Sequence, residues 1–157
     1  MAEVVGKPDG IIVPIGWGVR GAEGMIAAAN YAREKKVPYL GLCYGMQLAV
    51  VAYSRHILGL DKANTEENDP EAVDKVIHFI PHQKELVRQR AYGGTMRLGG
   101  WEAIVKKGTI AYEAYAKYGG LLDKKTGLTS ERHRHRYEFN DDYAIDLEKA
   151  GLVIAAR

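Results

Sequence analysis

The chain has 157 residues, of which 46% are apolar and 27% charged, and its formal net charge is +2. This composition is typical of a globular domain and excludes a disordered chain, and the small charge gives no indication of nucleic acid or a membrane surface as partner. The sequence has no run of about 18 apolar residues, no secretory signal, and only one cysteine, which cannot form an internal disulfide. We therefore predict one soluble, cytoplasmic domain spanning 1–157.

The first part of the chain alternates between short apolar runs and helical patterns. GIIVPIGWG (10–18) predicts a buried strand followed by a glycine-rich loop, and residues 21–36 predict an amphipathic helix. YLGL (39–42) predicts a second strand, and YGMQLAVVAYSRHIL (44–58) predicts a helix that is apolar nearly all round and therefore buried. The order strand, helix, strand, helix favours an α/β fold with a mostly parallel sheet flanked by helices.

The second part of the chain is less regular. Residues 58–75 are polar and acidic and predict a loop, 76–80 predict a strand, and 95–108 predict a hairpin of two short strands around Gly99 and Gly100. The remaining predicted elements are a helix at 109–119, a strand at 131–139, a helix at 141–151 and the start of a strand at 152–157.

The only cysteine, Cys43, lies between the second predicted strand and its helix. GLCYG places Gly41 and Gly45 around it, as in the G-x-S-x-G turn that exposes a nucleophile above a sheet. We expect the helix N-terminus to lower the pKa of this thiol, and the N–H of Tyr44 to face a developing oxyanion. The alternative is an inert cysteine between two glycines that merely allow close packing.

Four stretches in this order carry a resemblance: GWGVRGAEGMIAAANYAR, GLCYGMQLAVVAYSRHILGLDKAN, GGTMRLG and SERHRHRYEFN. Together they resemble class I glutamine amidotransferases, and within them the glutaminase domains of the CTP synthase family, over about residues 10 to 153. The resemblance implies the α/β amidotransferase fold with its strand–nucleophile elbow–helix. It also implies hydrolysis of glutamine to glutamate and ammonia, which would aminate UTP to CTP.

The resemblance implies a role for each matching residue around the nucleophile. Cys43 would attack the side-chain carbonyl of glutamine, release ammonia and leave a γ-glutamyl thioester. The backbone N–H groups of Gly16 and Tyr44 would form the oxyanion hole.

Three further positions are implied to bind glutamine, namely Gln47, Glu67 and Arg136. Glutamine carries a cation and an anion on one carbon, so a fixed carboxylate and a fixed guanidinium suit it. Without the resemblance, Glu67 would be a solvated carboxylate of an acidic loop and Arg136 a surface arginine of a strand. His133 and His135 alternate with the arginines and could be metal ligands, but no cysteine or third histidine is near, so we predict no metal site.

The sequence departs from the family pattern at two places. Ile15 stands where the family has the first of two glycines, and because isoleucine resists positive φ, we expect a strained or altered oxyanion loop. The family's catalytic histidine and its glutamate partner lie in an H-P-E motif, which none of the five histidines here occupies. The candidates for a base within the chain are then His78 and His82, which flank the end of a predicted strand.

The resemblance also implies that 1–157 is a partial glutaminase domain, truncated at both ends, and that the family's ATP-dependent synthetase domain, covalent or separate, is absent from this chain. ATP and Mg²⁺ would belong to that domain, and we expect no cofactor in this chain. The expected partners are glutamine, the synthetase domain and, through an open sheet edge, a second copy of the chain, but neither nucleic acid nor a membrane. We expect the chain alone to be inactive; the alternatives are an inactive amidotransferase-like module for binding or assembly, and another cysteine hydrolase of γ-glutamyl compounds.

Overall fold

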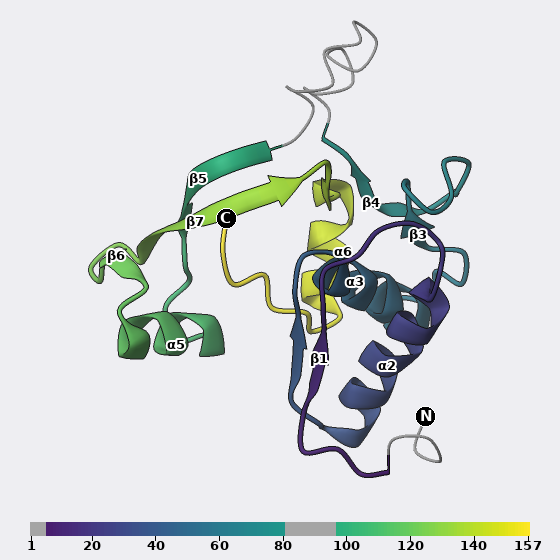
Figure 1. The fold of residues 1–157 in the computed structure, drawn as a ribbon, viewed down its shortest axis with the longest axis horizontal. Coiled ribbons are helices and arrows are strands. Elements are labelled where there is room, and N and C mark those ends of the chain that lie inside the picture. The colour runs from purple at the N-terminus through teal and green to yellow at the C-terminus, as the bar shows by residue number, and fades with distance from the viewer. Residues whose placement is uncertain (1–5, 81–96) are drawn as a thin grey trace, which may run out of the picture. The chain divides into compact units, whose positions relative to one another are not determined.

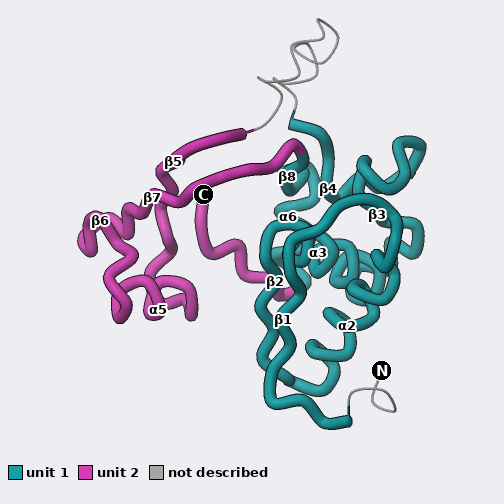
Figure 2. Tube along the Cα trace, viewed as in Figure 1, with its two compact units in different colours: residues 1–81, 137–150 teal, residues 82–136, 151–157 magenta. Residues whose placement is uncertain are grey.

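The computed structural model describes residues 6–80 and 97–157, which form two compact units (Figure 2). Unit 1 comprises Met1–Pro81 and Tyr137–Ala150, and unit 2 comprises His82–Arg136 and Gly151–Arg157. The chain therefore passes from unit 1 to unit 2, returns to unit 1 at Tyr137–Ala150, and passes to unit 2 again at Gly151–Arg157. That the two units fold together as one domain stays a prediction.

Unit 1 contains the predicted order of strands and helices. Its elements are β1 (Ile11–Val13), α2 (Ala22–Lys35), β2 (Tyr39–Gly41), α3 (Tyr44–Ile57), β3 (Asn64–Thr65), β4 (Lys75–Phe79), β8 (Tyr137–Phe139), the 3-10 turn η2 (Asp141–Tyr143) and α6 (Ala144–Lys149). β1 pairs with β2 in parallel and β3 with β4 in parallel, whereas β8 joins β4 in antiparallel orientation. With α2 and α3 packed beside the β1–β2 pair, unit 1 has the predicted α/β architecture (Figure 1).

The core of unit 1 is built around α3, as its apolar sequence predicts. Leu48 and Val51 have no exposed surface, and α2 packs against α3 through the buried residues Ala22, Ile26, Ala29 and Ala32. These four positions recur every three or four residues and therefore lie on one helical face. Because three of them are alanines, the two helices can approach closely.

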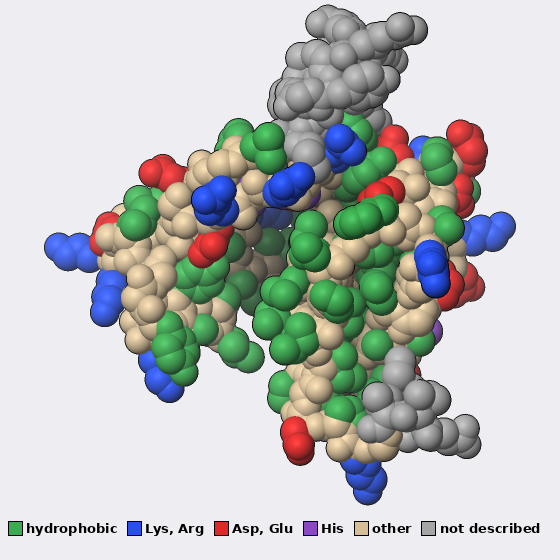
Figure 3. Space-filling model, viewed as in Figure 1, with side chains coloured by type: hydrophobic (Ala, Val, Ile, Leu, Met, Phe, Trp, Pro, Cys, Tyr) green, Lys and Arg blue, Asp and Glu red, His purple; other side chains and the backbone are tan. Residues whose placement is uncertain are grey.

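The opposite side of the β1–β2 pair carries apolar side chains that the unit does not bury. Ile12 is 68% exposed and Leu40 is 53% exposed, and the two are partners in the parallel register. Hydrophobic side chains gather in this region of unit 1 (Figure 3). Exposed apolar side chains of this kind favour the predicted self-association.

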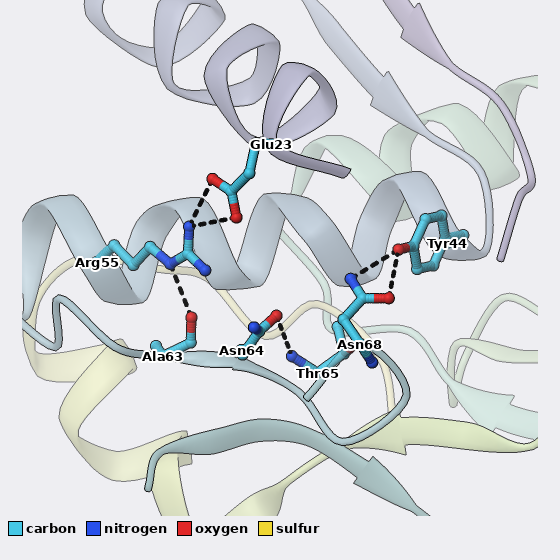
Figure 4. A network of polar contacts seen from close by, with 7 residues as sticks. All are labelled: Glu23, Tyr44, Arg55, Ala63, Asn64, Thr65 and Asn68. Carbon is cyan, nitrogen blue, oxygen red and sulfur yellow. Dashed lines mark hydrogen bonds and ion pairs between the residues drawn. The ribbon is translucent and has the colours of Figure 1, made fainter. Parts of the chain in front are cut away.

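A polar network ties α2 and α3 to the segment that leads into β3 (Figure 4). Arg55 Nη1 donates to both carboxylate oxygens of Glu23, at 3.0 and 2.9 Å, and Arg55 Nε donates to the carbonyl oxygen of Ala63 at 2.7 Å. The Arg55 side chain is 17% exposed and the Glu23 side chain 74%. The bond to Ala63 is therefore expected to contribute more to stability than the solvated ion pair.

We expect Arg55→Ala to lower the free energy of unfolding by about 1–2 kcal/mol, because it leaves the Ala63 carbonyl without its donor. The measurement is urea unfolding followed by circular dichroism. Arg33→Ala is the control, since the Arg33 side chain bonds to Asn30 and Glu34 of its own helix at the surface, and its cost is expected to stay below about 0.5 kcal/mol. Equal losses in the two variants would contradict this role of Arg55.

In its described residues, 97–136 and 151–157, unit 2 is an antiparallel sheet with one helix. Its elements are β5 (Arg97–Ile104), α5 (Ile110–Tyr118), β6 (Leu121–Asp123) and β7 (Leu128–His135), with strand order β5-β7-β6. The predicted hairpin around Gly99 and Gly100 is wrong, because β5 runs through both glycines in unbroken register with β7. Gly99 has a φ of +86°, which a glycine adopts without steric cost, so the strand continues where a turn was expected.

Other predicted elements differ in detail. The helix at 109–119 is confirmed as α5, where Thr109 Oγ1 accepts from the N–H of Tyr112 at 3.2 Å and Gly119 follows with a φ of +80°. The strand predicted at 131–139 is divided into β7 and β8, and the strand predicted at 152–157 is replaced by a single bridge between Val105 and Ala156. No helix in residues 6–80 and 97–157 has the length and apolar character needed to cross a membrane.

Candidate active site

Cys43 lies in a sharp turn between β2 and α3. The strand ends at Gly41, the N–H of Leu42 donates to the carbonyl oxygen of Val13 at 2.9 Å, and α3 begins at Tyr44. Between them, Cys43 has φ 52° and ψ −104°. Lys36 is the other described non-glycine residue with positive φ, but its angles belong to the ordinary left-handed region, whereas those of Cys43 do not. Such strained backbone concentrates at functional sites.

The two glycines of the turn are required by close backbone packing. A Cβ atom on Gly41 would lie 2.5 Å from the backbone nitrogen of Met46, and a Cβ atom on Gly45 would lie 2.9 Å from the carbonyl carbon of Val13 and closer still to its oxygen. Real Cβ atoms do not approach backbone so closely. The glycines therefore bring strand and helix together, which is what the nucleophile-elbow pattern predicts.

The Cys43 thiol is exposed, yet its pKa lies above the ordinary value. Partial burial raises the pKa most, a hydrogen bond from the N–H of Tyr44 lowers it, and the negative charge of Glu67 raises it. The predicted lowering by the helix N-terminus is therefore wrong as a net effect, because desolvation and the carboxylate outweigh the N–H. At neutral pH this thiol needs a base to become a thiolate.

We expect Glu67→Gln to make Cys43 more reactive toward iodoacetamide at pH 7.5. The Glu67 carboxylate raises the pKa of the Cys43 thiol. Removal of this charge therefore lowers the thiol pKa and increases the fraction of thiolate at pH 7.5. The pH dependence of the alkylation rate checks this, and its midpoint should move to lower pH. Glu71→Gln is the control, because Glu71 does not contribute to the pKa of Cys43. A midpoint unchanged in Glu67→Gln would contradict the assigned charge effect.

The loop after β1 packs against the first residue of α3. A Cβ atom on Gly16 would lie 3.1 Å from Cδ1 of Tyr44, so the backbone of Gly16 lies against the ring. The strain expected at Ile15 is absent, because Ile15 does not have a positive φ and its side chain is 67% exposed. Gly18 adopts the positive φ instead, at +71°. That Gly16 N–H and Tyr44 N–H bind an oxyanion stays a prediction.

Side-chain contacts connect this loop to Tyr44 and to the segment after β3. Tyr44 Oη donates to the carbonyl oxygen of Gly18 at 2.6 Å, and the N–H of Gly18 donates to Glu67 Oε1 at 3.3 Å. Because the phenol has one hydrogen and the Gly18 carbonyl can only accept it, Asn68 Nδ2 donates to Tyr44 Oη at 2.8 Å (Figure 4). Tyr44, Gly18 and Asn68 are far apart along the chain, so no sequence pattern indicated this network.

The predicted glutamine-binding residues fall in different surroundings. Glu67 is half-buried, and its negative charge raises the pKa of the Cys43 thiol. The neighbouring Glu66 instead accepts a hydrogen bond from the backbone N–H of Phe79 at 2.7 Å. Gln47 is buried, and its Nε2 donates to the carbonyl oxygen of Tyr137 at 3.0 Å. Arg136 is the last residue of unit 2 before the chain returns to unit 1. The contacts of these residues with glutamine stay predictions.

The histidines do not form a metal site in the part of the chain that the structure describes. No group of three or more His, Cys, Asp or Glu side chains in residues 6–80 and 97–157 could hold a metal ion. His133 Nδ1 and His135 Nε2 lie 2.8 Å apart on β7, and burial, His135 and Arg97 lower the pKa of His133. His78 lies in β4, and His82 lies outside the described residues.

The family model for class I glutamine amidotransferases matches residues 1–157, the whole chain. The chain belongs to the class I glutamine amidotransferase family. The predicted resemblance to this family is confirmed.

The relatives of this amidotransferase narrow the family. It is 52% identical over 147 residues to a CTP synthase of Sulfurisphaera tokodaii, covering 94% of this chain and 25% of the relative. It is 46% identical over 156 residues to a CTP synthase of Listeria monocytogenes, covering 99% of this chain and 27% of the relative. The chain thus spans about a quarter of the length of these relatives.

A solved structure supports the same relationship. The fold matches the glutaminase domain of Trypanosoma brucei CTPS with bound acivicin, with a TM-score of 0.83 and 39% sequence identity. The match covers 98% of this chain and 54% of that chain. The predicted α/β class and the predicted similarity to the glutaminase domain of CTP synthase are both confirmed.

Proposed function

We propose that this amidotransferase domain hydrolyses glutamine with Cys43 as the nucleophile and supplies the ammonia for amination of UTP to CTP. The observation that carries the proposal is the strained backbone of Cys43 between two glycines that tolerate no Cβ atom. A strained, exposed thiol at the start of a helix has no evident packing function, whereas a nucleophile needs exposure and a nearby N–H.

The proposed reaction proceeds through a thioester. Cys43 Sγ attacks the side-chain carbonyl carbon of glutamine, a C–S bond forms, and the N–H groups of Gly16 and Tyr44 stabilise the oxyanion. The C–N bond then breaks, and the leaving nitrogen takes up a proton and departs as ammonia. Water adds to the thioester to give glutamate and the free thiol.

Both steps require a general base, and we propose that unit 1 does not supply one within its described residues. The histidines of unit 1 in residues 6–80 and 137–150 are His56 and His78. His56 is 13 residues beyond Cys43 on the same helix, about 20 Å along its axis. Among the described residues, no histidine contributes to the pKa of Cys43, whose shift comes from burial, Tyr44 N–H and Glu67. We therefore expect the isolated chain to turn over little glutamine.

Ammonia release from glutamine, measured with and without imidazole as an external base, tests this proposal. The expected result is negligible release alone, release that rises with imidazole concentration, and none in Cys43→Ala. Release without imidazole that disappears in His78→Ala would place the base inside unit 1. A folded chain that stays silent at every imidazole concentration would contradict catalysis by Cys43 and favour an inactive binding module.

The recognition of glutamine is proposed to depend on Glu67 for the α-ammonium group, with Gln47 and Arg136 as further contacts. The electrostatic effect of Glu67 on the Cys43 pKa supports this, because the α-ammonium group and the reacting carbonyl belong to one small molecule. We expect glutamine, but not glutamate, to protect Cys43 from iodoacetamide. Protection that persists in Glu67→Gln would contradict the role of the carboxylate.

The proposed partners are a synthetase domain, which would bind ATP and Mg²⁺, and a second copy of the chain. Self-association is supported by the exposed Ile12 and Leu40 on the β1–β2 pair. Sedimentation velocity over a range of concentrations tests it, with Leu40→Lys as the variant expected to dissociate. A wild-type chain that sediments as a monomer at every concentration would contradict it.

A further inference from the structure

We propose that the hydroxyl group of Tyr44 is a positioning element that couples the oxyanion loop to the glutamine-recognising carboxylate. The inference rests on the proposed function. It adds a role for the side chain of Tyr44, a residue of which only the backbone N–H had a predicted role. Tyr44 does not need to touch glutamine in this account. It acts through Gly18, which it holds from one side while Glu67 holds it from the other.

The phenol of Tyr44 is buried within unit 1. Tyr44 is 1% exposed, so its hydroxyl group must satisfy its hydrogen bonds within the protein. It does so with one donated bond, at 2.6 Å to the Gly18 carbonyl, and one accepted bond, at 2.8 Å from Asn68 Nδ2. Burial raises the pKa of Tyr44, so the group stays a protonated donor at neutral pH.

The two hydrogen bonds of the Tyr44 hydroxyl group connect two segments of unit 1. Gly18 belongs to the loop that follows β1, and Asn68 belongs to the segment after β3, directly after Glu67. The N–H of Gly18 donates to Glu67 Oε1, so the peptide groups on both sides of Gly18 are fixed. With a φ of +71°, Gly18 adopts a left-handed conformation, which glycine accepts without steric cost.

The position of Gly16 depends on the same contacts. This residue lies against the Tyr44 ring and two residues before the fixed Gly18. An oxyanion-hole N–H is effective only when it is held in position before charge develops. The phenol therefore orients Gly16 through Gly18 and orients Glu67 through the same glycine, so that oxyanion and α-ammonium sites keep a fixed separation.

Two reactions of the same thiol separate positioning from general stability. Acylation by an activated γ-glutamyl ester passes through an oxyanion but needs no proton for its leaving group, whereas alkylation by iodoacetamide forms no oxyanion. We expect Tyr44→Phe to reduce the acylation rate about tenfold and to leave the alkylation rate within about twofold. Asn68→Ala should reduce acylation less, and adding it to Tyr44→Phe should have little further effect, because both act through one contact.

Tyr53→Phe is the matched control. Tyr53 lies on the same helix, and its hydroxyl group also donates to a backbone carbonyl, that of Ala150, at 2.8 Å. The expected result is unchanged acylation in this variant, whatever its stability. Equal acylation in Tyr44→Phe and wild type, or equal losses in acylation and alkylation, would overturn the positioning role. A wild-type chain that is alkylated but never acylated would instead overturn the proposed function, and this inference with it.

Discussion

Gly45→Ala is expected to destabilise unit 1 by about 3 kcal/mol, because the added methyl group would clash with the backbone of β1. The new Cβ atom would lie 2.9 Å from the carbonyl carbon of Val13 and closer to its oxygen. Val13 cannot move away easily, since its carbonyl accepts the N–H of Leu42 and the residue pairs with Gly41 of β2. The helix and the strand must therefore separate, and the turn at Cys43 must open.

Urea unfolding of Gly45→Ala and of a matched variant, Gly24→Ala, measures this effect. Gly24 also lies inside a helix, α2, but a Cβ atom there would have nothing within 4 Å. The same substitution should then stabilise the protein by up to about 1 kcal/mol, because alanine is the better helix former. Opposite signs in the two variants are the expected result, and similar small changes in both would contradict the tight contact at Gly45.

The second large effect concerns the backbone strain at Cys43. With φ 52° and ψ −104°, the residue occupies a region that is the mirror image of extended backbone, which glycine adopts readily and other residues do not. We expect Cys43→Gly to be more stable than Cys43→Ala by about 1–2 kcal/mol. Both variants should lose all thioester formation, because neither carries a thiol.

Ser54 provides the comparison for this prediction. It lies on the same helix, α3, and its backbone does not have a positive φ. There Ser54→Ala should be more stable than Ser54→Gly by about 1 kcal/mol, the reverse of the order at Cys43. Thermal or urea unfolding of the four variants gives both differences. The same order at both positions would mean that the turn at Cys43 is not strained.

The sequence predicted the parts of the fold that depend on local pattern. The order β1, α2, β2, α3 and the glycines around Cys43 follow from apolar periodicity and from the need for small residues at a sharp turn. The prediction of a hairpin around Gly99 was wrong because a glycine permits a turn without requiring one. β5 instead pairs with β7 along its whole length. Tertiary pairing decided what local chemistry left open.

The site was predicted in its residues but not in its energetics. Cys43 was expected to be acidified by its helix, whereas burial and Glu67 raise its pKa. Those influences come from segments distant in sequence, so no local pattern announces them. The bonds between Tyr44, Gly18 and Asn68 were missed for the same reason, since each residue alone has an ordinary role in a loop or a core.

The most direct measurement of the central claim is intact-mass and peptide-mapping analysis of the chain after reaction with an activated γ-glutamyl ester and acid quenching. We expect one γ-glutamyl group, attached to Cys43, removed by hydroxylamine as expected for a thioester and absent from Cys43→Ala. A folded chain that carries no adduct, or an adduct at another residue that persists in Cys43→Ala, would contradict it.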